Sequence, residues 1–361
     1  MNAPHFALRQ VMTKAELAGV IDSAGVPGLL SPRSLLGAPK QSSPAATGAL
    51  RGAAHVLCDP HTRITLRIWG GEEASAETTV LFSADPVVGG GYLLNDVAGG
   101  FEVSGPVEAE QILALVAPLL PPSAPGTPFV AQFEPATMAV LAALIDIARD
   151  DIRQDRIASV LDGRPVPDSL LASLAPLAML RLTTYLDGWW VLSRFDQFLT
   201  YAVALGGEPK PPQPSAVAAA LSQLSSVGLI AIDDSQNITL AAAAAPLVEA
   251  VFGLCAGFQW QRVTRLNDGN LSINERIVLP CAGGQILSLS VTAAGLLRLA
   301  RASRDEISAF LASELTGTAN GPTPVEEAMP KAAQARRFCE HCGHPVGAAD
   351  RFCGECGREL N

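Results

Sequence analysis

Two Cys-x-x-Cys pairs near the C-terminal end of the sequence restrict most strongly how that part of the chain can fold. Cys339 and Cys342 form the first pair, and Cys353 and Cys356 form the second, with ten residues between the pairs. Four thiolates from two tight turns complete the tetrahedral coordination of a zinc ion. A segment of about 25 residues buries too little surface to fold alone, so metal binding would supply its folding energy. The spacing therefore predicts one structural Zn²⁺ held by these four cysteines.

The residues around the cysteines repeat as well. A phenylalanine precedes and a glycine follows each pair: Phe338, Phe352, Gly343 and Gly357. This repetition of the whole knuckle argues against two disulfides and against a redox-active pair. His341 and His344 lie beside the ligands. We expect both to face solvent, because four cysteines already fill the metal shell; an exchange of a cysteine ligand for a histidine stays open as an alternative.

The knuckles resemble the short bacterial zinc-ribbon family, and the resemblance covers residues 337–358. Members of that family are mostly structural and serve binding. The resemblance therefore implies a docking module at this end of the chain rather than an active site.

Composition places the rest of the chain among globular proteins. Its 361 residues suffice for two or three domains, and 48% are hydrophobic while 17% are charged. The net charge is −10, and no basic stretch is visible, so nucleic acid is not an expected partner. Cys58, Cys255 and Cys281 show no pairing pattern, which together with zinc-binding thiolates indicates a reducing, cytoplasmic location.

No membrane segment is predicted. The N-terminus has no basic stretch followed by an apolar one, so we do not expect a signal peptide. The longest apolar run, residues 240–258, is interrupted by Pro246 and Glu249. This run is better interpreted as a buried helix than as a membrane span.

Three blocks of the sequence recur in the same order, which indicates an internal duplication. Residues 13–24 and 137–148 are identical at seven of twelve positions, and both are interpreted as amphipathic helices with a threonine near the N-cap. The second block pairs residues 50–66 with 224–240 and is interpreted as a helix, a short strand that includes Cys58, an Asp-led turn and a second strand. The third pairs 98–115 with 282–299 as a hairpin turn, a strand and a closing helix.

The predicted fold class is α+β: two homologous halves related by a pseudo-twofold axis, with winged-helix-like helices and small antiparallel sheets, and a C-terminal zinc ribbon. Proline-rich and small-residue stretches mark the linkers. The predicted domains are a first half at 1–120, a linker at 121–135, a second half at 136–315 with a helical insertion at about 164–212, a flexible linker at 316–336, and the ribbon at 337–361.

The body has two resemblances. A helix that ends at Gly228, followed by a hairpin with Asp233 at its turn, is similar in outline to a winged helix, which implies DNA binding or protein pairing. Residues 25–30 and 50–52 resemble the beginning of the EspG-type chaperones of type VII secretion. That resemblance would cover about residues 1–315 and implies an adaptor that binds a partner protein. The ribbon and the central insertion depart from this family.

No catalytic arrangement is predicted. The five histidines include none between positions 62 and 340, so a nucleophile–histidine system would need His55 or His61. His61 is assigned to a turn and Cys58 to a buried thiol. The glycine-rich residues 87–92 lack the Gly-Lys-Ser/Thr ending of a phosphate loop and are interpreted as a hairpin loop.

One aromatic cluster leaves two interpretations open. Its members follow helical spacing: Trp189, Trp190, Phe195, Phe198 and Tyr201. Core packing of the insertion is the favoured interpretation, and a peptide-binding groove is the alternative.

The function expected from the sequence is a non-enzymatic scaffold for protein–protein interaction: an adaptor, or a chaperone-like component of assembly or secretion, with the zinc ribbon as a docking module. Protein partners are expected, whereas the sequence specifies neither their identity nor the oligomeric state. A DNA-binding transcriptional regulator built from winged-helix-like halves and a ribbon is the alternative.

Overall fold

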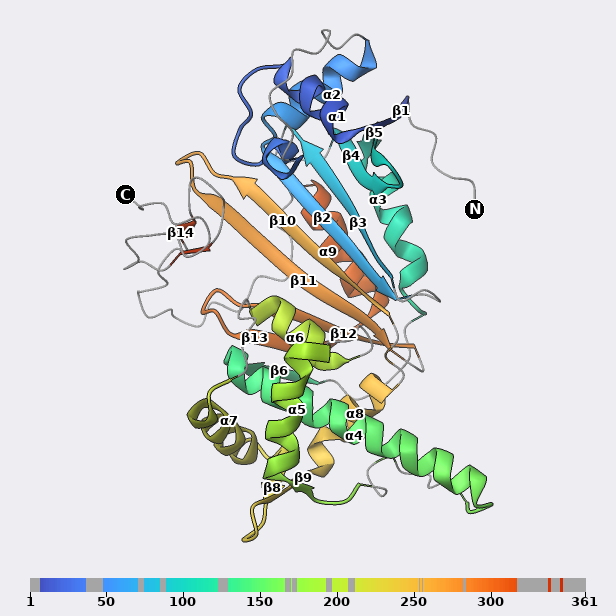
Figure 1. Ribbon diagram of the computed structural model, residues 1–361, viewed down its shortest axis with the longest axis vertical. Coiled ribbons are helices and arrows are strands. Elements are labelled where there is room, and N and C mark those ends of the chain that lie inside the picture. The colour runs from blue at the N-terminus through green and yellow to red at the C-terminus, as the bar shows by residue number, and fades with distance from the viewer. Residues whose placement is uncertain are drawn as a thin grey trace.

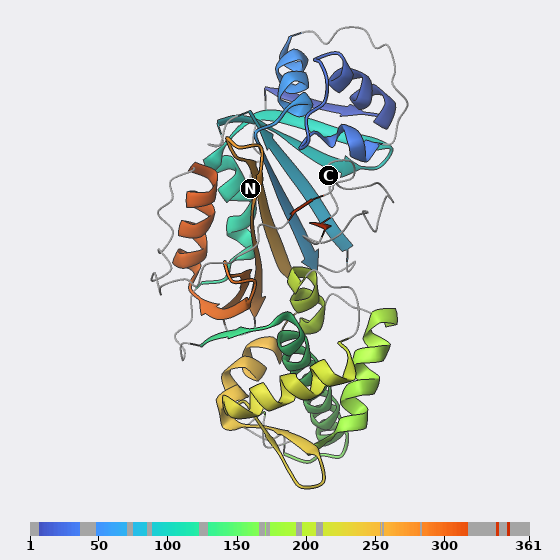
Figure 2. The same cartoon turned by 90° about the vertical axis from the view of Figure 1, so that its left-hand side faces the viewer.

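A computed structural model describes residues 7–36, 48–70, 75–84, 89–122, 129–165, 170, 174–192, 197–206, 212–252, 254, 256–281, 284–316, 337–338 and 345–346. One large antiparallel sheet runs through the molecule, with helices at both of its ends and across one of its faces (Figures 1 and 2).

The sheet has ten strands in the order β1-β5-β4-β3-β2-β10-β11-β12-β13-β6. From edge to edge these are Leu8–Met12, Gly100–Glu108, Gly89–Val97, Ser75–Ser83, Thr62–Gly70, Gly257–Arg265, Leu271–Cys281, Gln285–Val291, Leu297–Ala302 and Val130–Phe133. At the centre β2 pairs with β10, where Leu66 lies opposite Trp260. The two halves of the sheet have the same strand connectivity, counted from either edge to the centre. Each half begins with an edge strand, passes to the centre, and returns outward as a meander of four strands.

Two helices close one face of the sheet. α3 (Ala109–Val116) and α9 (Arg304–Thr316) lie side by side over it, on the left in Figure 2. Apolar side chains from the central strands pack beneath them: Ile64, Leu66, Phe258, Trp260, Val278 and Ile286. Successive residues of a strand point to opposite faces, so this core fixes which residues point to the other face.

A small helical cap packs on β3, β4 and β5 at the upper end in Figure 1. It consists of α1 (Lys14–Asp22), α2 (Ala49–Cys58) and a 3-10 turn, η1 (Pro32–Leu36). Thr13 begins α1 as its N-cap: its hydroxyl accepts from the Glu16 amide at 3.2 Å, and the Glu16 carboxylate accepts from the Thr13 amide at 2.8 Å. The threonine expected near this N-cap is confirmed.

A helical subdomain covers the other end of the sheet. α4 (Pro135–Leu161) lies at its centre and contacts α5 (Met179–Leu192), α6 (Phe198–Gly206), α7 (Pro214–Ser226) and α8 (Ala245–Phe252). A three-stranded sheet completes it, with β7 (Leu177–Ala178), β9 (Asn237–Leu240) and β8 (Ile230–Ile232) in that order. α4 is buried on all sides from Thr137 to Arg149, because its apolar run has neighbours in every direction.

The α+β class is confirmed, but the small separate sheets are not. The predicted half 1–120 supplies five strands to one continuous sheet and the half 136–315 supplies four, in addition to the separate three-stranded sheet of β7, β9 and β8. The range 121–135, expected as a linker, contains the edge strand β6. Local patterning identified the strands correctly as antiparallel, whereas the β2–β10 pairing joins residues about 200 positions apart and has no local signal.

The second and third repeat blocks match unlike elements. Residues 56–58 end helix α2, while their counterparts 230–232 form strand β8, so a winged-helix-like hairpin exists after α7 but not after α2. Likewise β5 leads into the closing helix α3, whereas residues 297–299 belong to strand β13. Short apolar runs of this kind fit a buried helix end and a strand equally well.

Candidate functional site

The sheet face opposite α3 and α9 is the broadest functional candidate. Because Ile64 and Leu66 of β2 point into the core beneath those helices, Arg63, Thr65 and Arg67 point the other way. The same alternation on β3, β10 and β11 gives the set that we call the open face: Arg63, Thr65, Arg67, Thr78, Val80, Gln259, Gln261, Ile273 and Glu275.

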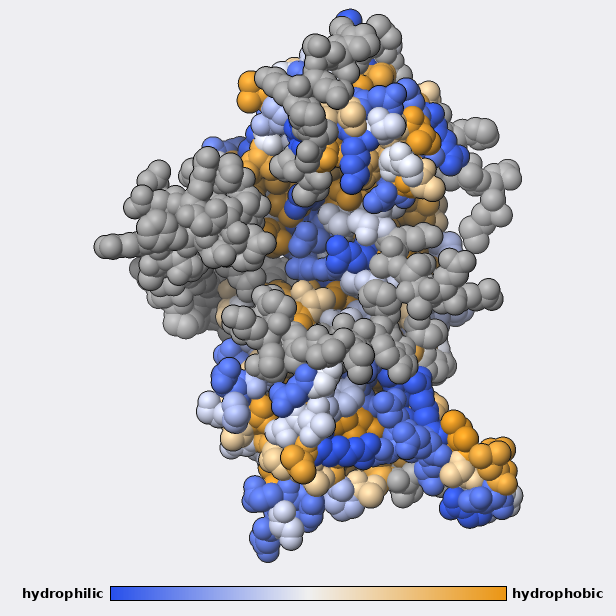
Figure 3. All heavy atoms as spheres, viewed as in Figure 1, coloured by the Kyte–Doolittle hydropathy of each residue, from blue (hydrophilic) through white to orange (hydrophobic). Residues whose placement is uncertain are grey.

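The open face is accessible and mainly polar. Arg67 and Ile273 are exposed, and the other seven residues are half-buried. Figure 3 shows hydrophilic residues at the bottom of a hollow between the two helical ends. Gln259 donates a hydrogen bond to the Glu275 carboxylate, so the one described acid of this face has a partner. Among the described residues, no helix lies over the middle of this face.

The upper rim of the open face belongs to the small cap. Asp59 follows α2 and accepts from Arg265 of β10, with 2.7 Å between Oδ1 and Nη1. Within the cap, the Arg33 guanidinium forms two hydrogen bonds with the Asp22 carboxylate at 2.8 and 3.0 Å. A bidentate pair of this kind fixes relative orientation as well as distance. One ion pair therefore holds the elements of the cap together, and another attaches the cap to the central sheet.

The lower rim is formed by α6. Tyr201 is fully buried and meets Trp69 of β2 edge to face, with ring centroids 5.2 Å apart and planes at 70°. Gly257 of β10 lies under the same helix, and a Cβ atom there would come within 2.7 Å of Leu279 Cδ2 and 3.5 Å of the Tyr201 ring. The absent side chain at Gly257 thus leaves room for Leu279 of β11, while the Tyr201 ring lies at ordinary contact distance. Such an aromatic pair stabilises the contact by about 0.5–1.5 kcal/mol beyond area burial.

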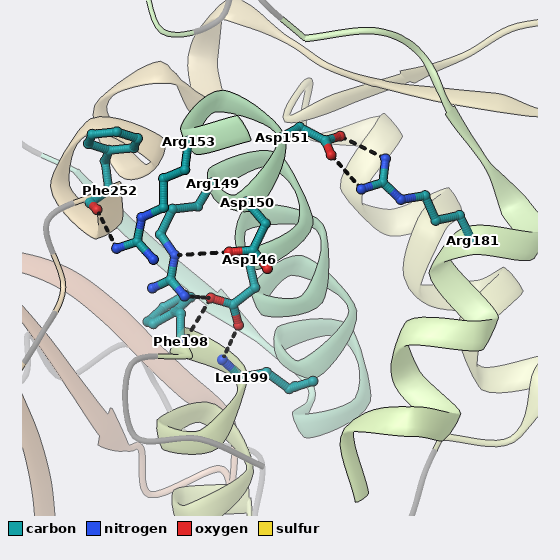
Figure 4. A network of polar contacts seen from close by, with 9 residues as sticks. All are labelled: Asp146, Arg149, Asp150, Asp151, Arg153, Arg181, Phe198, Leu199 and Phe252. Carbon is teal, nitrogen blue, oxygen red and sulfur yellow. Dashed lines mark hydrogen bonds and ion pairs between the residues drawn. The ribbon is translucent and has the colours of Figure 1, made fainter. Parts of the chain in front are cut away.

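A buried carboxylate holds the beginning of α6. Asp146 of α4 accepts hydrogen bonds from the backbone amides of Phe198 and Leu199, each at 2.8 Å (Figure 4). Arg149, one turn further along α4, places Nη2 3.6 Å from Asp146 Oδ1, and both side chains are shielded from solvent. Burial raises the pKa of Asp146 to about 7, against the opposing effects of the Arg149 charge and the two amides.

Further polar contacts connect α4 to its neighbours (Figure 4). Asp151 forms a two-pronged ion pair with Arg181 of α5. Arg153 donates to the Phe252 carbonyl of α8 at 3.2 Å, and Arg156 lies 5.0 Å from the centre of the Phe252 ring. The helices that support the lower rim are therefore joined by polar contacts as well as by apolar packing.

The predicted zinc ligands Cys339, Cys342, Cys353 and Cys356 lie outside the described residues. The structure does describe the two short strands that enclose the first knuckle, β14 (Arg337–Phe338) and β15 (Pro345–Val346). They pair antiparallel, with Phe338 opposite Pro345. This pairing closes a six-residue loop around the first Cys-x-x-Cys, as a metal knuckle needs, and the four-thiolate donor set is the one that zinc prefers.

The remaining candidates for chemistry are placed as follows. Cys58 is buried, as expected, but it ends helix α2 and does not lie on a strand. Burial, reinforced by Asp59 and Asp22, raises the pKa of its thiol, which disfavours a reactive thiolate. His61 immediately precedes β2, with its Nδ1 3.4 Å from the Thr62 hydroxyl. Gly89–Gly91 begin strand β4 rather than forming a loop, and residues 87–88 lie outside the described part.

The aromatic cluster is core where the structure describes its side chains. Phe198 and Tyr201 are both fully buried, which confirms the core interpretation for these two. Phe195 and the side chains of Trp189 and Trp190 lie outside the description. Sequence reasoning missed Asp146 and Arg149, although two opposite charges three positions apart within an apolar helical run are a visible signal.

Within the described part of the chain, none of the helices combines the length and the apolar character that crossing a membrane requires.

Comparison with known proteins supports the zinc-ribbon resemblance noted from the sequence. Residues 338–360 match the zinc-ribbon domain family. The search of curated proteins gave no match. Among solved structures, the chain is similar to the Mycobacterium tuberculosis type VII secretion system chaperone EspG5, in its complex with the PE25–PPE41 dimer. The sequence identity is 10%, the alignment covers 85% of this chain and 94% of that chain, and the TM-score is 0.38.

Proposed function

We propose that this protein is a non-enzymatic scaffold that holds a segment of a partner protein on its open face, in the manner of an adaptor or chaperone. The observation that carries the proposal is the difference between the two faces of the central sheet. α3 and α9 close one face over an apolar core, whereas the other face stays accessible between two rims.

The chemistry of the open face suits a protein segment. Its glutamine, threonine and arginine side chains offer hydrogen-bond donors and acceptors, and Val80 and Ile273 add apolar contact area. Mixed surfaces of this kind are typical of protein–protein interfaces that form and separate. Arg265–Asp59 and Trp69–Tyr201 attach the rims to the central strands. A receptor whose parts are held in place before binding loses less conformational freedom when a partner binds.

The C-terminal ribbon is the second part of the proposal. One Zn²⁺ bound by Cys339, Cys342, Cys353 and Cys356 would fix the two knuckles, and its chemistry there is structural. The pairing of β14 with β15 and the zinc-ribbon match support this assignment. A folded ribbon on residues 316–336 as a tether would give the protein a second docking module in the cytoplasm.

We also infer that the two halves of the body arose by duplication of one unit. The support is the strand order, in which β1 with β2–β5 mirrors β6 with β10–β13 about the β2–β10 pair. α1 follows the first edge strand as α4 follows the second, and α3 and α9 close the meanders. A partner surface made of both halves would then lie across the axis that relates them.

Site-specific photo-crosslinking in the native host tests the docking proposal. A photoreactive amino acid replaces Gln261 on the open face, and a matched control replaces Ala309, which is exposed on the outer side of α9. We expect a discrete protein adduct from position 261 that is absent from position 309. Equal adducts from both positions, or none from position 261, would contradict a docking role for this face.

A further inference from the structure

Arg63 is a positive charge of the open face for which the described chain supplies no partner. It lies on β2 between Phe82 and Val263, its cross-strand neighbours, which are 1% and 3% exposed. Its Nε is shielded from solvent and makes no hydrogen bond, and no described carboxylate forms an ion pair with it. Burial lowers the pKa of its guanidinium, and no nearby acid offsets that effect.

On the opposite face, Arg262 and Arg276 also have a shielded Nε that makes no hydrogen bond, but a group of the chain lies against the charge of each. Arg262 of β10 lies 3.9 Å from Glu314 of α9, and Arg276 of β11 lies over the Phe310 ring at 3.7 Å from its centre. Glu314 is held in place by Asn274 at 2.7 Å. Beneath α9 the chain thus provides both an acid and an aromatic ring for its buried cations. On the open face, Glu275 is bonded to Gln259 and Asp59 to Arg265.

A partly shielded cation without a counterion is unfavourable for the protein that contains it, because the desolvation of its shielded part is not offset by an ion pair. Such a group calls for an explanation outside the free chain. The residue as a whole is only half-buried, so an incoming group can reach its guanidinium.

We propose that the segment bound on the open face carries an aspartate or glutamate whose carboxylate pairs with the guanidinium of Arg63. This inference rests on the docking role proposed above and specifies the chemistry of the partner. Arg67, on the same face of β2, adds a second, exposed positive charge that favours an acidic segment. The acidic residue of the partner supplies the counterion that the described chain does not provide for Arg63.

Replacement of Arg63 should change the stability of the free protein and its affinity for the partner in opposite directions. Replacement of Arg63 by methionine removes an uncompensated charge, so the free protein keeps or gains stability. The same replacement leaves the carboxylate of the bound segment without its partner, so binding weakens by about tenfold or more. A residue with a purely structural role would instead lower stability and affect binding only through unfolding.

The test uses a displayed library of randomised helical peptides, selected on the full-length protein. Peptides that crosslink to a photoreactive group at Gln261 are kept, because these occupy the open face. We expect them to contain an aspartate or glutamate and to lose affinity about tenfold or more against Arg63→Met. Arg164→Met is the control, because it removes an exposed arginine just beyond α4 that is not part of the open face and should leave the affinity unchanged.

A double-mutant cycle completes the test. Exchange of the peptide's acid for its amide should weaken binding to the wild type but hardly change binding to Arg63→Met. If Arg63→Met fails to fold, Arg63→Lys, which keeps the charge and loses the planar fork, is measured in its place with the same expectation of weaker binding.

The outcomes separate the two proposals. Peptides that occupy the open face without an acid, or that bind Arg63→Met as tightly as the wild type, overturn the inference and leave the docking role intact. If no selected peptide crosslinks at Gln261, the docking role fails and the inference fails with it.

Discussion

The carboxylate of Asp146 accepts a hydrogen bond at 2.8 Å from the backbone amide of Phe198, 52 positions further along the chain. This bond fixes the first turn of α6, which carries Tyr201 onto Trp69 at the lower rim of the open face. A buried acid in the helical subdomain thereby positions a helix that borders the candidate docking surface.

Replacement of Asp146 by alanine should destabilise the protein strongly. The change removes the acceptor for two backbone amides and leaves Arg149 buried without its carboxylate, which costs about 3–5 kcal/mol. Urea unfolding followed by circular dichroism measures the loss. Asp150→Asn is the control, because Asp150 is partly exposed and its ion pair is long. A loss for Asp146→Ala no greater than that of the control would contradict this role.

Stability should also depend on the protonation of Asp146. Its pKa is about 7 in the folded chain and near the ordinary value of 3.8 in the unfolded one. Between these values the folded state holds the proton more tightly, so the stabilisation present below pH 4 is lost as the pH rises toward 7. The unfolding free energy of the wild type minus that of Asp146→Asn should therefore become smaller as the pH rises over this range. A difference that grows with pH would show that Arg149 and the two amides keep the carboxylate ionised.

Loss of the Tyr201 ring should weaken the attachment of α6 to the sheet. Tyr201→Ala leaves a cavity beside Trp69 and above Gly257, with an expected cost of about 3–5 kcal/mol. Tyr201→Phe keeps the ring and its edge-to-face contact with Trp69, so its cost should be much smaller than that of Tyr201→Ala. Thermal unfolding of both variants measures the difference. Equal losses would mean that the hydroxyl, rather than the ring, holds the helix.

The ribbon should account for the zinc. Elemental analysis should give about one zinc per chain, and Cys353→Ser should reduce it sharply, because three thiolates no longer fill the shell. His341→Ala and His344→Ala are the controls and should retain the metal. A chain that ends at Leu315 should lose the zinc and keep the unfolding midpoint of the body. Zinc retained by that shortened chain would place the metal elsewhere.

The sequence was most informative where structure is decided locally. The capping box of Thr13 and Glu16 is formed by neighbours, and the β8–β9 hairpin follows from its turn around Asp233. The helix at residues 56–58 was mistaken for a strand, since three apolar residues fit either element.

The long-range contacts of the site could not be predicted from the sequence. The β2–β10 pair and the bond from Asp146 to Phe198 join residues far apart in the chain, and no periodicity specifies them. The open face is defined by Ile64 and Leu66, which point beneath α3 and α9, and the sequence does not specify where these two helices pack. The role proposed for Arg63 depends on its buried cross-strand neighbours and on its missing counterion, which the sequence alone does not specify.

Co-purification from the native host tests the docking role of the open face most directly. Quantitative mass spectrometry compares proteins retained by the wild type, by Thr65→Trp, which fills the middle of the open face, and by Ala309→Trp on the outer side of α9. We expect a partner that the wild type and Ala309→Trp retain and that Thr65→Trp loses while staying folded. Retention of the same proteins by folded Thr65→Trp would contradict the claim that this face holds the partner.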